Sequence, residues 1–160
     1  MLVRKATEED FTQIHPLIIK RTEEFGLPTS HVPNIKKLVE DYSSNSPKFY
    51  CLVCELDTRI IGYVSYSYAY SSWIGRSINI NELYVLLGYR DVGQLPMLHR
   101  LVNITLELKC LQVKCSAPDN TEFSKFLVEN GTSVMSKEDG YSLYNLEAEG
   151  FKKLGAMPQI

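Results

Sequence analysis

One stretch of the chain, residues 79–96, combines residue types that could bind a phosphate group. An apolar run leads into a turn that holds Gly88, Arg90 and Gly93, and Pro96 follows where a helix can begin. Backbone N–H groups at the start of a helix attract anions, and glycine lets a ligand approach the backbone closely. The stretch therefore predicts a buried strand, a glycine turn and a helix that starts at Pro96, with a phosphate site at the turn.

Two polar residues within the same strand could act on a substrate. Glu82 carries a carboxylate, whereas Asn81 carries an amide, which cannot accept a proton but can orient a water molecule. Successive side chains of a strand point to opposite faces, so Glu82 is expected on the other face from Asn81. An exposed acid that pairs with Arg59, Arg76 or Lys114 is an equally good interpretation of Glu82.

Two cysteines, Cys51 and Cys54, have the spacing of a metal knuckle or a redox pair. They lie, however, in an apolar run that predicts a strand at residues 48–56, where residues three apart point to opposite faces. Buried structural thiols are therefore favoured over a metal or redox role. The three histidines have no spacing that suggests a metal site either.

The elements that position these residues follow from apolar spacing and from turn residues. Strands are predicted at residues 2–6, 48–56, 59–70, 79–87, 111–116, 133–135 and 141–146. Helices are predicted at residues 7–25, 34–42, 96–108 and 121–129. This order predicts one α/β domain over residues 1–149, with a central mixed, twisted sheet flanked by helices, and a C-terminal tail at residues 150–160.

Several local features are predicted within these elements. The first helix is expected to start at Thr7 and to be interrupted and kinked by Pro16, and Asp57 and Thr58 are expected to close a hairpin. The tyrosines of the strand at residues 59–70 are interpreted as a half-buried face, with a cleft for an amine or an aromatic ligand as the alternative. The third helix is expected to bury Leu98, Leu101, Val102, Thr105 and Leu108.

The bulk composition is that of an ordinary globular domain. The chain has 160 residues, of which 44% are hydrophobic and 22% charged, and a formal net charge of −2. This charge provides no attraction to nucleic acid or to an anionic membrane, and no segment has the roughly 20 consecutive apolar residues of a membrane span. Because the N-terminus lacks the apolar region of a signal peptide, a cytoplasmic location is expected, with the nucleus accessible to a chain of this size.

The order of elements, with a strand, a turn and a helix at its centre, resembles that of the GCN5-related N-acetyltransferase (GNAT) superfamily. Within this superfamily the chain is most similar to the diamine acetyltransferases, the spermidine/spermine and thialysine group. The similarity extends from Val3 to Tyr144, and its most specific segments are residues 49–53, 70–76 and 88–90.

Members of this family transfer an acetyl group from acetyl-CoA to a primary amine. The resemblance implies that the central strand holds the pantetheine arm and that the turn presents backbone N–H groups to the diphosphate. A carboxylate on the strand helps to deprotonate the amine, and a tyrosine on the late helix protonates the departing thiolate. The implied acetyl-CoA site consists of Leu83, Tyr84, Val85, Arg90, Asp91, Gly93, Leu95 and Asn120.

The chain departs from the family at the cofactor turn. The family has glycine or alanine where this chain has Leu95, whose side chain would obstruct the diphosphate. Pro96 lacks an N–H group that an anion site would use, and Asp91 adds a negative charge that opposes the charge of Arg90. All three changes predict weaker binding of acetyl-CoA.

The catalytic positions depart as well. Aligning Asn120 and Gly131 with the family's turn and helix stop places Leu127 where the acid tyrosine belongs, and leucine cannot donate a proton. Loss of a general acid lowers the rate by a factor of about 10²–10⁴. Asn81 occupies the position of the base, and the resemblance assigns amine recognition to Glu82.

The sequence supports three functional hypotheses. The favoured one is a pseudoenzyme with weak or no binding of acetyl-CoA, which acts through protein contacts as a homodimer and with a further protein partner. The family forms intertwined homodimers through C-terminal strands, which the predicted closing hairpin could provide. The alternative is an active acetyltransferase on a small primary amine, a polyamine or a lysine side chain. A third, weaker interpretation keeps CoA as a bound ligand without turnover.

Overall fold

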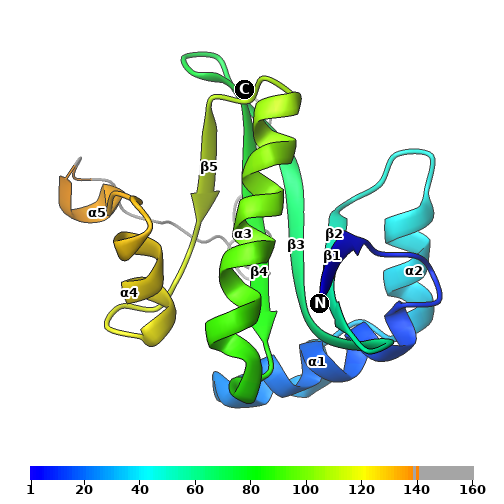
Figure 1. Ribbon diagram of the computed structural model, residues 1–160. Helices are drawn as coiled ribbons and strands as arrows, with labels where there is room; N and C mark the ends of the chain where they lie inside the picture. Colours follow the sequence, from blue (N-terminus) through cyan, green and yellow to red (C-terminus); the bar gives the residue numbers. More distant parts are fainter. Residues whose placement is uncertain (139, 141–160) are drawn as a thin grey trace, which may run out of the picture. The chain divides into compact units, whose positions relative to one another are not determined.

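The computed structural model describes residues 1–138 and residue 140 (Figure 1). Within this part of the chain, five strands form one sheet in the order β1-β2-β3-β4-β5. The strands are β1 (Leu2–Lys5), β2 (Tyr50–Leu56), β3 (Arg59–Ser71), β4 (Gly75–Val85) and β5 (Gln112–Cys115). Adjacent strands are antiparallel except β4 and β5, which are parallel, so the sheet is mixed, as predicted.

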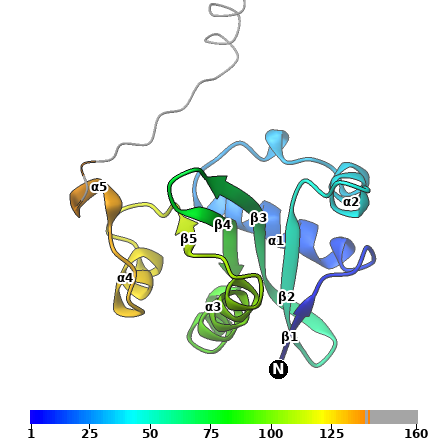
Figure 2. The same cartoon turned by 90° about the horizontal axis from the view of Figure 1, so that it is seen from above.

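Helices cover both faces of the sheet. They are α1 (Phe11–Glu24), α2 (Ile35–Ser43) and α3 (Arg90–Glu107), with short 3₁₀ helices η1 (Thr29–His31) and η2 (Leu87–Tyr89). α1 and α2 lie on one face and α3 lies on the other (Figure 2). The chain divides into two compact units, residues 1–116 and 117–160. The described part of the second unit contains α4 (Glu122–Glu129) and α5 (Met135–Glu138).

The hairpin of β2 and β3 is closed by Asp57 and Thr58, as predicted. Both residues have positive φ angles, 48° and 67°, as in the two-residue turn whose twist matches that of the flanking strands. Tyr50 and Tyr66 stack across this pair of strands, with their ring centroids 5.6 Å apart. The exposed fraction of the tyrosines rises from 2% at Tyr66 to 77% at Tyr70, so this strand face is half-buried, as interpreted.

The first helix begins later than predicted. α1 starts at Phe11 instead of Thr7, because the carboxylate of Asp10 accepts a 2.6 Å hydrogen bond from the backbone N–H of Thr7 and holds the preceding residues in a turn. The guanidinium of Arg4 donates two further bonds, of 2.6 and 2.9 Å, to the same carboxylate. The predicted interruption at Pro16 is also wrong, since α1 continues through this residue, whereas the kink expected there stays a prediction.

The third helix begins earlier than predicted and presents a different face to the sheet. α3 starts at Arg90, so the missing N–H of Pro96 falls at the seventh residue and not at the anion-binding end. Val102 and Leu108, predicted to be buried, are each 38% exposed. The helix has apolar side chains on two sides, and apolar spacing alone does not tell which side meets the sheet. Its buried residues are Gly93, Met97, Leu101, Ile104 and Thr105.

The prediction of a strand at residues 133–135, as the first strand of the closing hairpin, is wrong. Residues 133 and 134 have no regular secondary structure, and Met135 begins α5. The backbone N–H of Lys137 donates a 2.9 Å hydrogen bond to the oxygen of Val134, which closes a helical turn where a strand was expected. The second strand, at residues 141–146, and the tail predicted at residues 150–160 lie outside the described residues.

Candidate functional site

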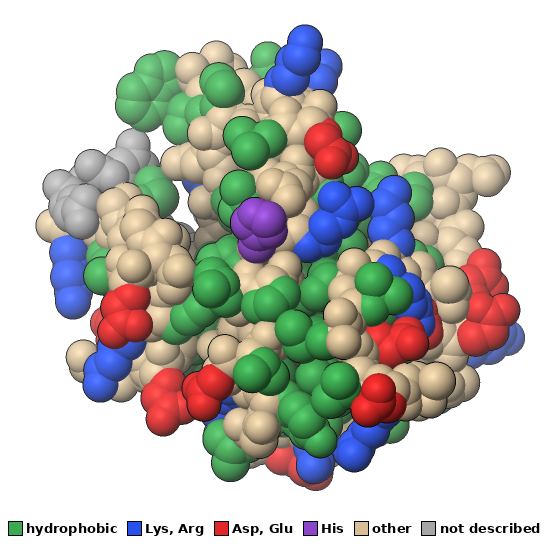
Figure 3. Space-filling view, in the orientation of Figure 1, with side chains coloured by type: hydrophobic (Ala, Val, Ile, Leu, Met, Phe, Trp, Pro, Cys, Tyr) green, Lys and Arg blue, Asp and Glu red, His purple; other side chains and the backbone are tan. Residues whose placement is uncertain are grey.

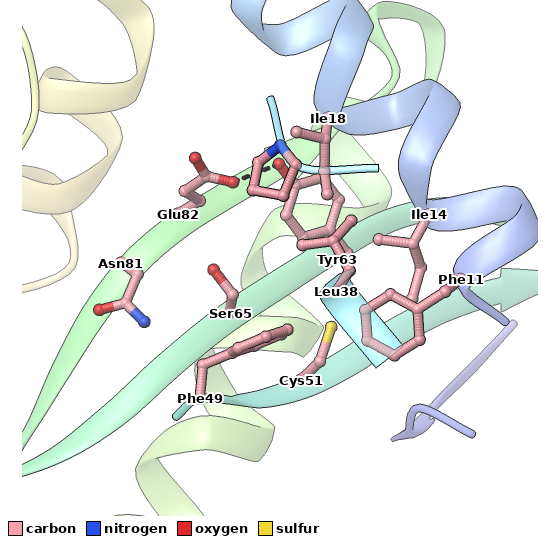
Figure 4. Close-up of a pocket in the computed structure, with 11 residues that line it drawn as sticks. Phe11, Ile14, Ile18, Leu38, Phe49, Cys51, Tyr63, Ser65, Asn81 and Glu82 are labelled. Atoms are coloured by element: carbon pink, nitrogen blue, oxygen red, sulfur yellow. Dashed lines mark hydrogen bonds between the residues drawn. The ribbon is translucent and has the colours of Figure 1, made fainter. Parts of the chain in front are cut away.

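A β-bulge at Asn81 shapes the middle of β4. In the pairing of β3 with β4, Ser65 lies opposite Glu82 and Tyr66 lies opposite Ile80, so the register skips Asn81. An extra residue of this kind shifts the alternation of side chains along its strand. Asn81 and Glu82 therefore line the same cavity, and the prediction that they point to opposite faces is wrong (Figure 4).

This cavity has a volume of about 290 Å³ and lies between the sheet and the helices α1 and α2. Its wall is mostly apolar and is formed by Phe11, Ile14, Ile18, Pro33, Leu38, Phe49 and Cys51. Its polar side is formed by Tyr63, Ser65, Asn81 and Glu82. A cavity of this composition suits a ligand with an apolar body and one polar head group.

Both carboxylate oxygens of Glu82 accept hydrogen bonds. The hydroxyl of Tyr63 donates to Oε2 at 2.6 Å, and Nη1 of Arg21 donates to Oε1 at 3.0 Å. The cation that pairs with Glu82 is thus on α1, and not among the three that the sequence suggested. Burial, and then the negative charge of Glu82, raises the pKa of Tyr63 well above its ordinary value. Tyr63 is therefore a neutral hydrogen-bond donor at physiological pH.

Asn81 lies at the exposed side of the cavity. Its Oδ1 accepts a 3.1 Å hydrogen bond from the hydroxyl of Ser67 on the neighbouring strand. Because an amide has no basic group, Asn81 can orient a water molecule or a polar substrate group but cannot remove a proton. The structure therefore brings the two strand residues of the predicted site together and leaves Glu82 as the acid of the pair.

Beyond Ile80, β4 pairs with a strand on one side only, within the described part of the chain. β5 pairs with β4 as far as Ile80, whereas β3 continues alongside it to Val85. The backbone of residues 81–85 can therefore offer hydrogen bonds to a ligand along the open edge. Leu83, Tyr84 and Val85, expected to hold the pantetheine arm of acetyl-CoA, lie on this segment with buried side chains.

The cation of the predicted cofactor turn contacts an acid of α1. Nη2 of Arg90 donates a 2.5 Å hydrogen bond to Oε2 of Glu24, and Nε donates a 3.3 Å bond to the backbone oxygen of Val85. The hydroxyl of Tyr84 donates to the other oxygen of Glu24 at 2.6 Å. Burial, and then this bond to a carboxylate, raises the pKa of Tyr84 to about 12. Glu24 therefore joins α1, β4 and α3 where the resemblance places the diphosphate.

The other residues of the cofactor turn lie on different sides of α3. A Cβ atom at Gly93 would be 3.0 Å from Cγ1 of Val85, so a side chain at this position would push α3 away from β4. Leu95 is 51% exposed, and Asp91 is also exposed. The glycine of the turn thus faces the sheet, while the leucine and the aspartate face solvent.

The last two predicted site residues belong to the second unit. Asn120 has a φ angle of 60° and forms the turn before α4, a conformation that asparagine tolerates better than most residues. Leu127 is a buried residue of α4. The helix starts with a capping box in which Thr121 and Ser124 exchange hydrogen bonds. The roles of Asn120 in cofactor binding and of Leu127 at the acid position stay predictions.

The two cysteines of β2 point to opposite faces of the sheet, as predicted. Cys51 lines the cavity, whereas Sγ of Cys54 lies 3.8 Å from the position that a Cβ of Gly93 would take, on the face covered by α3. Both thiols are free and buried, and burial raises the pKa of each. Among the described residues, no group of three or more His, Cys, Asp or Glu side chains could hold a metal ion. Nor does any helix in this part of the chain have the length and apolarity needed to cross a membrane.

Three residues of the site were not predicted from the sequence: Arg21, Glu24 and Tyr63. Each contacts a residue that is distant along the chain; Arg21 and Glu82 are 61 positions apart, and Glu24 and Arg90 are 66 apart. The interval of three between Arg21 and Glu24 places both on one side of a helix. This spacing was the sign of a shared site that the sequence offered, and it does not identify the residues that Arg21 and Glu24 contact.

The chain is similar in sequence to known acetyltransferases. It is 26% identical over 167 residues to a thialysine N-epsilon-acetyltransferase from Mus musculus, with 95% of each chain covered. It is 25% identical over 122 residues to spermidine/spermine N(1)-acetyltransferase-like protein 1 from Homo sapiens, with 70% of this chain and 17% of that protein covered. No protein-family model matches the chain.

The fold also occurs in solved structures. That of a ribosomal-protein-alanine N-acetyltransferase from Brucella melitensis biovar Abortus 2308 matches with a TM-score of 0.71 at 16% identity, over 92% of this chain and 100% of that one. This likeness shows the fold, a mixed sheet flanked by helices. Together with the sequence similarity, this fold supports the GNAT superfamily, close to the diamine acetyltransferases.

Proposed function

We propose that this chain is a diamine-acetyltransferase-like protein with impaired catalysis and weak or no binding of acetyl-CoA, which acts in the cytoplasm or nucleus through contacts with protein chains. The observation that carries this proposal is the ion pair between Arg90 and Glu24. A diphosphate would need the same guanidinium, and the carboxylate of Glu24 would then face the negative charge of the phosphate groups.

The remaining residues of the turn also fit a diphosphate poorly. Asp91 adds a second negative charge in the first turn of α3, and Leu95 places an apolar side chain where the family has a small residue. The glycine at position 93 is accounted for by its packing against Val85 and needs no ligand to explain it. One cation is therefore opposed by two acids at the expected anion site.

The candidate catalytic residues support impaired chemistry. Since Arg21 and Tyr63 donate to the two oxygens of Glu82, a substrate amine would compete with a guanidinium for the same carboxylate. Asn81 cannot accept a proton, and Leu127, at the position that the resemblance assigns to the general acid, cannot donate one. Without a positioned acid and base, turnover is expected to fall by about 10²-fold or more.

Thermal unfolding with and without millimolar acetyl-CoA tests the proposal. A ligand at 100 times its dissociation constant stabilises a protein by about 2.7 kcal/mol, which for a chain of this size raises the melting temperature by about 5–10 °C. We expect no resolvable shift. Sodium pyrophosphate at the same ionic strength controls for general effects of anions. A rise of several degrees with acetyl-CoA but not with pyrophosphate would overturn the proposal.

A second candidate function is an active N-acetyltransferase on a small primary amine, a polyamine or a lysine side chain. It is favoured by the carboxylate of Glu82, which lies in a ligand-sized cavity on the open segment of β4. Acetylation of a panel of amines, followed by mass spectrometry, tests it. Glu40→Gln, which changes an exposed acid of α2, is the matched control. Turnover that Glu82→Gln abolishes and Glu40→Gln leaves unchanged would replace the first proposal with this one.

A further inference from the structure

The wall of the cavity beside Glu82 has no net charge. Of the side chains that line it, Glu82 alone is charged, and the guanidinium of Arg21 neutralises this carboxylate at 3.0 Å. The second oxygen of Glu82 accepts the hydrogen bond of Tyr63. A cationic ligand would therefore compete with Arg21 for the carboxylate, and an anionic ligand would be repelled by it.

The rest of the molecule adds no attraction for a charged ligand. The formal net charge of the chain is −2, and acidic and basic side chains are interspersed on the face of the molecule that Figure 3 shows. The wall of the cavity is mostly apolar, and an ion that leaves water for such surroundings loses its hydration without gaining a partner. The cavity therefore favours a neutral ligand.

Two polar groups of the cavity have no hydrogen-bond partner within the described part of the chain. Ser65 is only 8% exposed, and its hydroxyl makes no hydrogen bond there. Oδ1 of Asn81 accepts the bond of Ser67, whereas Nδ2 of Asn81 has no partner among the described residues and is turned toward the cavity (Figure 4). Because buried polar groups are normally paired, a donor at Asn81 and a hydroxyl at Ser65 are both available to a ligand.

We propose that this cavity binds a small neutral carboxamide with an apolar body. The oxygen of a carboxamide accepts the hydrogen bond of Nδ2 of Asn81, and its nitrogen donates to Oγ of Ser65, so that one uncharged head group satisfies both residues. This inference goes beyond the proposed function, because it assigns a ligand to the cavity, and it does not require acetyl-CoA.

The size and the wall of the cavity define the body of this ligand. A cavity of about 150 Å³ holds one benzene ring, so a volume of about 290 Å³ admits roughly 10–12 non-hydrogen atoms. The rings of Phe11 and Phe49 lie edge to face in the wall, with their centroids 6.1 Å apart. An aromatic ring on a short aliphatic chain, with the carboxamide at its end, fits these dimensions.

Three ligands with the same body and different head groups test the proposal: phenylpropionamide, which is neutral, phenylpropylamine, a cation at neutral pH, and phenylpropionate, an anion. Each is titrated without acetyl-CoA into the full chain labelled with ¹⁵N, and heteronuclear NMR spectra are recorded. We expect the amide to bind with a dissociation constant of about 0.1–1 mM, and the two ions at least about tenfold more weakly. The signals that shift should include the backbone amide of Ser65 and the side-chain amide of Asn81.

Substitutions test the head-group contact and the charge of the wall separately. Ser65→Ala should weaken binding of the amide about three- to tenfold, since one hydrogen bond is lost. Ser72→Ala, at an exposed serine between β3 and β4, is the matched control and should leave the affinity unchanged. Arg21→Gln leaves the carboxylate of Glu82 without its cation. It should therefore tighten binding of the amine about tenfold or more and change the affinity of the amide less than about threefold.

Four results would overturn the proposal. The first is no binding of the amide at concentrations up to about 5 mM, and the second is binding of the amine or the propionate to the wild type as tight as that of the amide. The third is a set of shifted signals that leaves out Ser65 and Asn81, which would locate the ligand elsewhere. The fourth is an equal effect of Ser65→Ala and Ser72→Ala. Circular dichroism confirms that each variant is folded.

Discussion

The proposed loss of the anion site can be tested by removing the contact between Arg90 and Glu24, which should restore binding of an anion. Glu24→Gln removes the carboxylate charge that Nη2 of Arg90 contacts at 2.5 Å and keeps the size of the side chain. The amide oxygen can still accept the hydrogen bond of Tyr84. A phosphate oxygen then becomes a better acceptor for the guanidinium than the amide, because its bond is charge-assisted on both sides.

The expected magnitudes follow from exposure and from the type of bond. The side chains of Arg90 and Glu24 are 25% and 42% exposed, so their solvent-screened pair contributes about 0–1 kcal/mol, and the variant should melt at most about 4 °C lower. A charge-assisted bond to a phosphate contributes about 1.5–3 kcal/mol, which corresponds to roughly 10–150-fold tighter binding. Removing the charge should also lower the pKa of Tyr84 from about 12, while burial keeps it above the ordinary value of about 10.

Isothermal titration with inorganic pyrophosphate and with coenzyme A measures the gain. Glu23→Gln is the matched control, because it removes the same charge from the neighbouring, exposed residue of α1. We expect Glu24→Gln to bind both ligands about tenfold more tightly than Glu23→Gln, or better. Equal affinities, or no binding by either variant, would refute the reasoning, because the contact with Arg90 would then not be what keeps the anion out.

Two further predictions concern the sheet that carries the site. A Cβ atom at Gly62 would lie 2.7 Å from the backbone oxygen of Tyr84, so Gly62→Ala should lower the free energy of unfolding in urea by about 2 kcal/mol; an unchanged value would contradict this packing. Hydrogen bonds from Arg4 hold the pKa of Asp10 below its ordinary value, so this stabilisation is complete above about pH 4 and is lost as the pH falls through the lower folded pKa. Asp10→Asn should lower the free energy of unfolding by about 1–3 kcal/mol at neutral pH, and the variant should lose less stability than the wild type on acidification. Melting temperatures that fall in parallel for the two proteins as the pH is lowered would contradict this prediction.

The bulge at Asn81 can be predicted from the sequence, but only when the apolar positions before it are compared with those after it. Apolar residues occupy the even positions Ile78 and Ile80 and then the odd positions Leu83 and Val85, and all four are buried. A change of parity within a buried strand requires one extra residue between Ile80 and Leu83. Simple alternation predicts the strand correctly and misses the bulge, which is why it assigns Asn81 and its neighbour to opposite faces.

Features set by local residues were predicted, whereas those set by packing between distant elements were not. The hairpin at Asp57 follows from its turn residues alone. The orientation of α3 does not, because either of its two apolar stripes could meet the sheet. The close approach of Gly93 to Val85 decides between them, since the helix can come this near only on the side that lacks a Cβ atom. The contact of Glu24 with α3 likewise depends on where α1 lies, which no local pattern specifies.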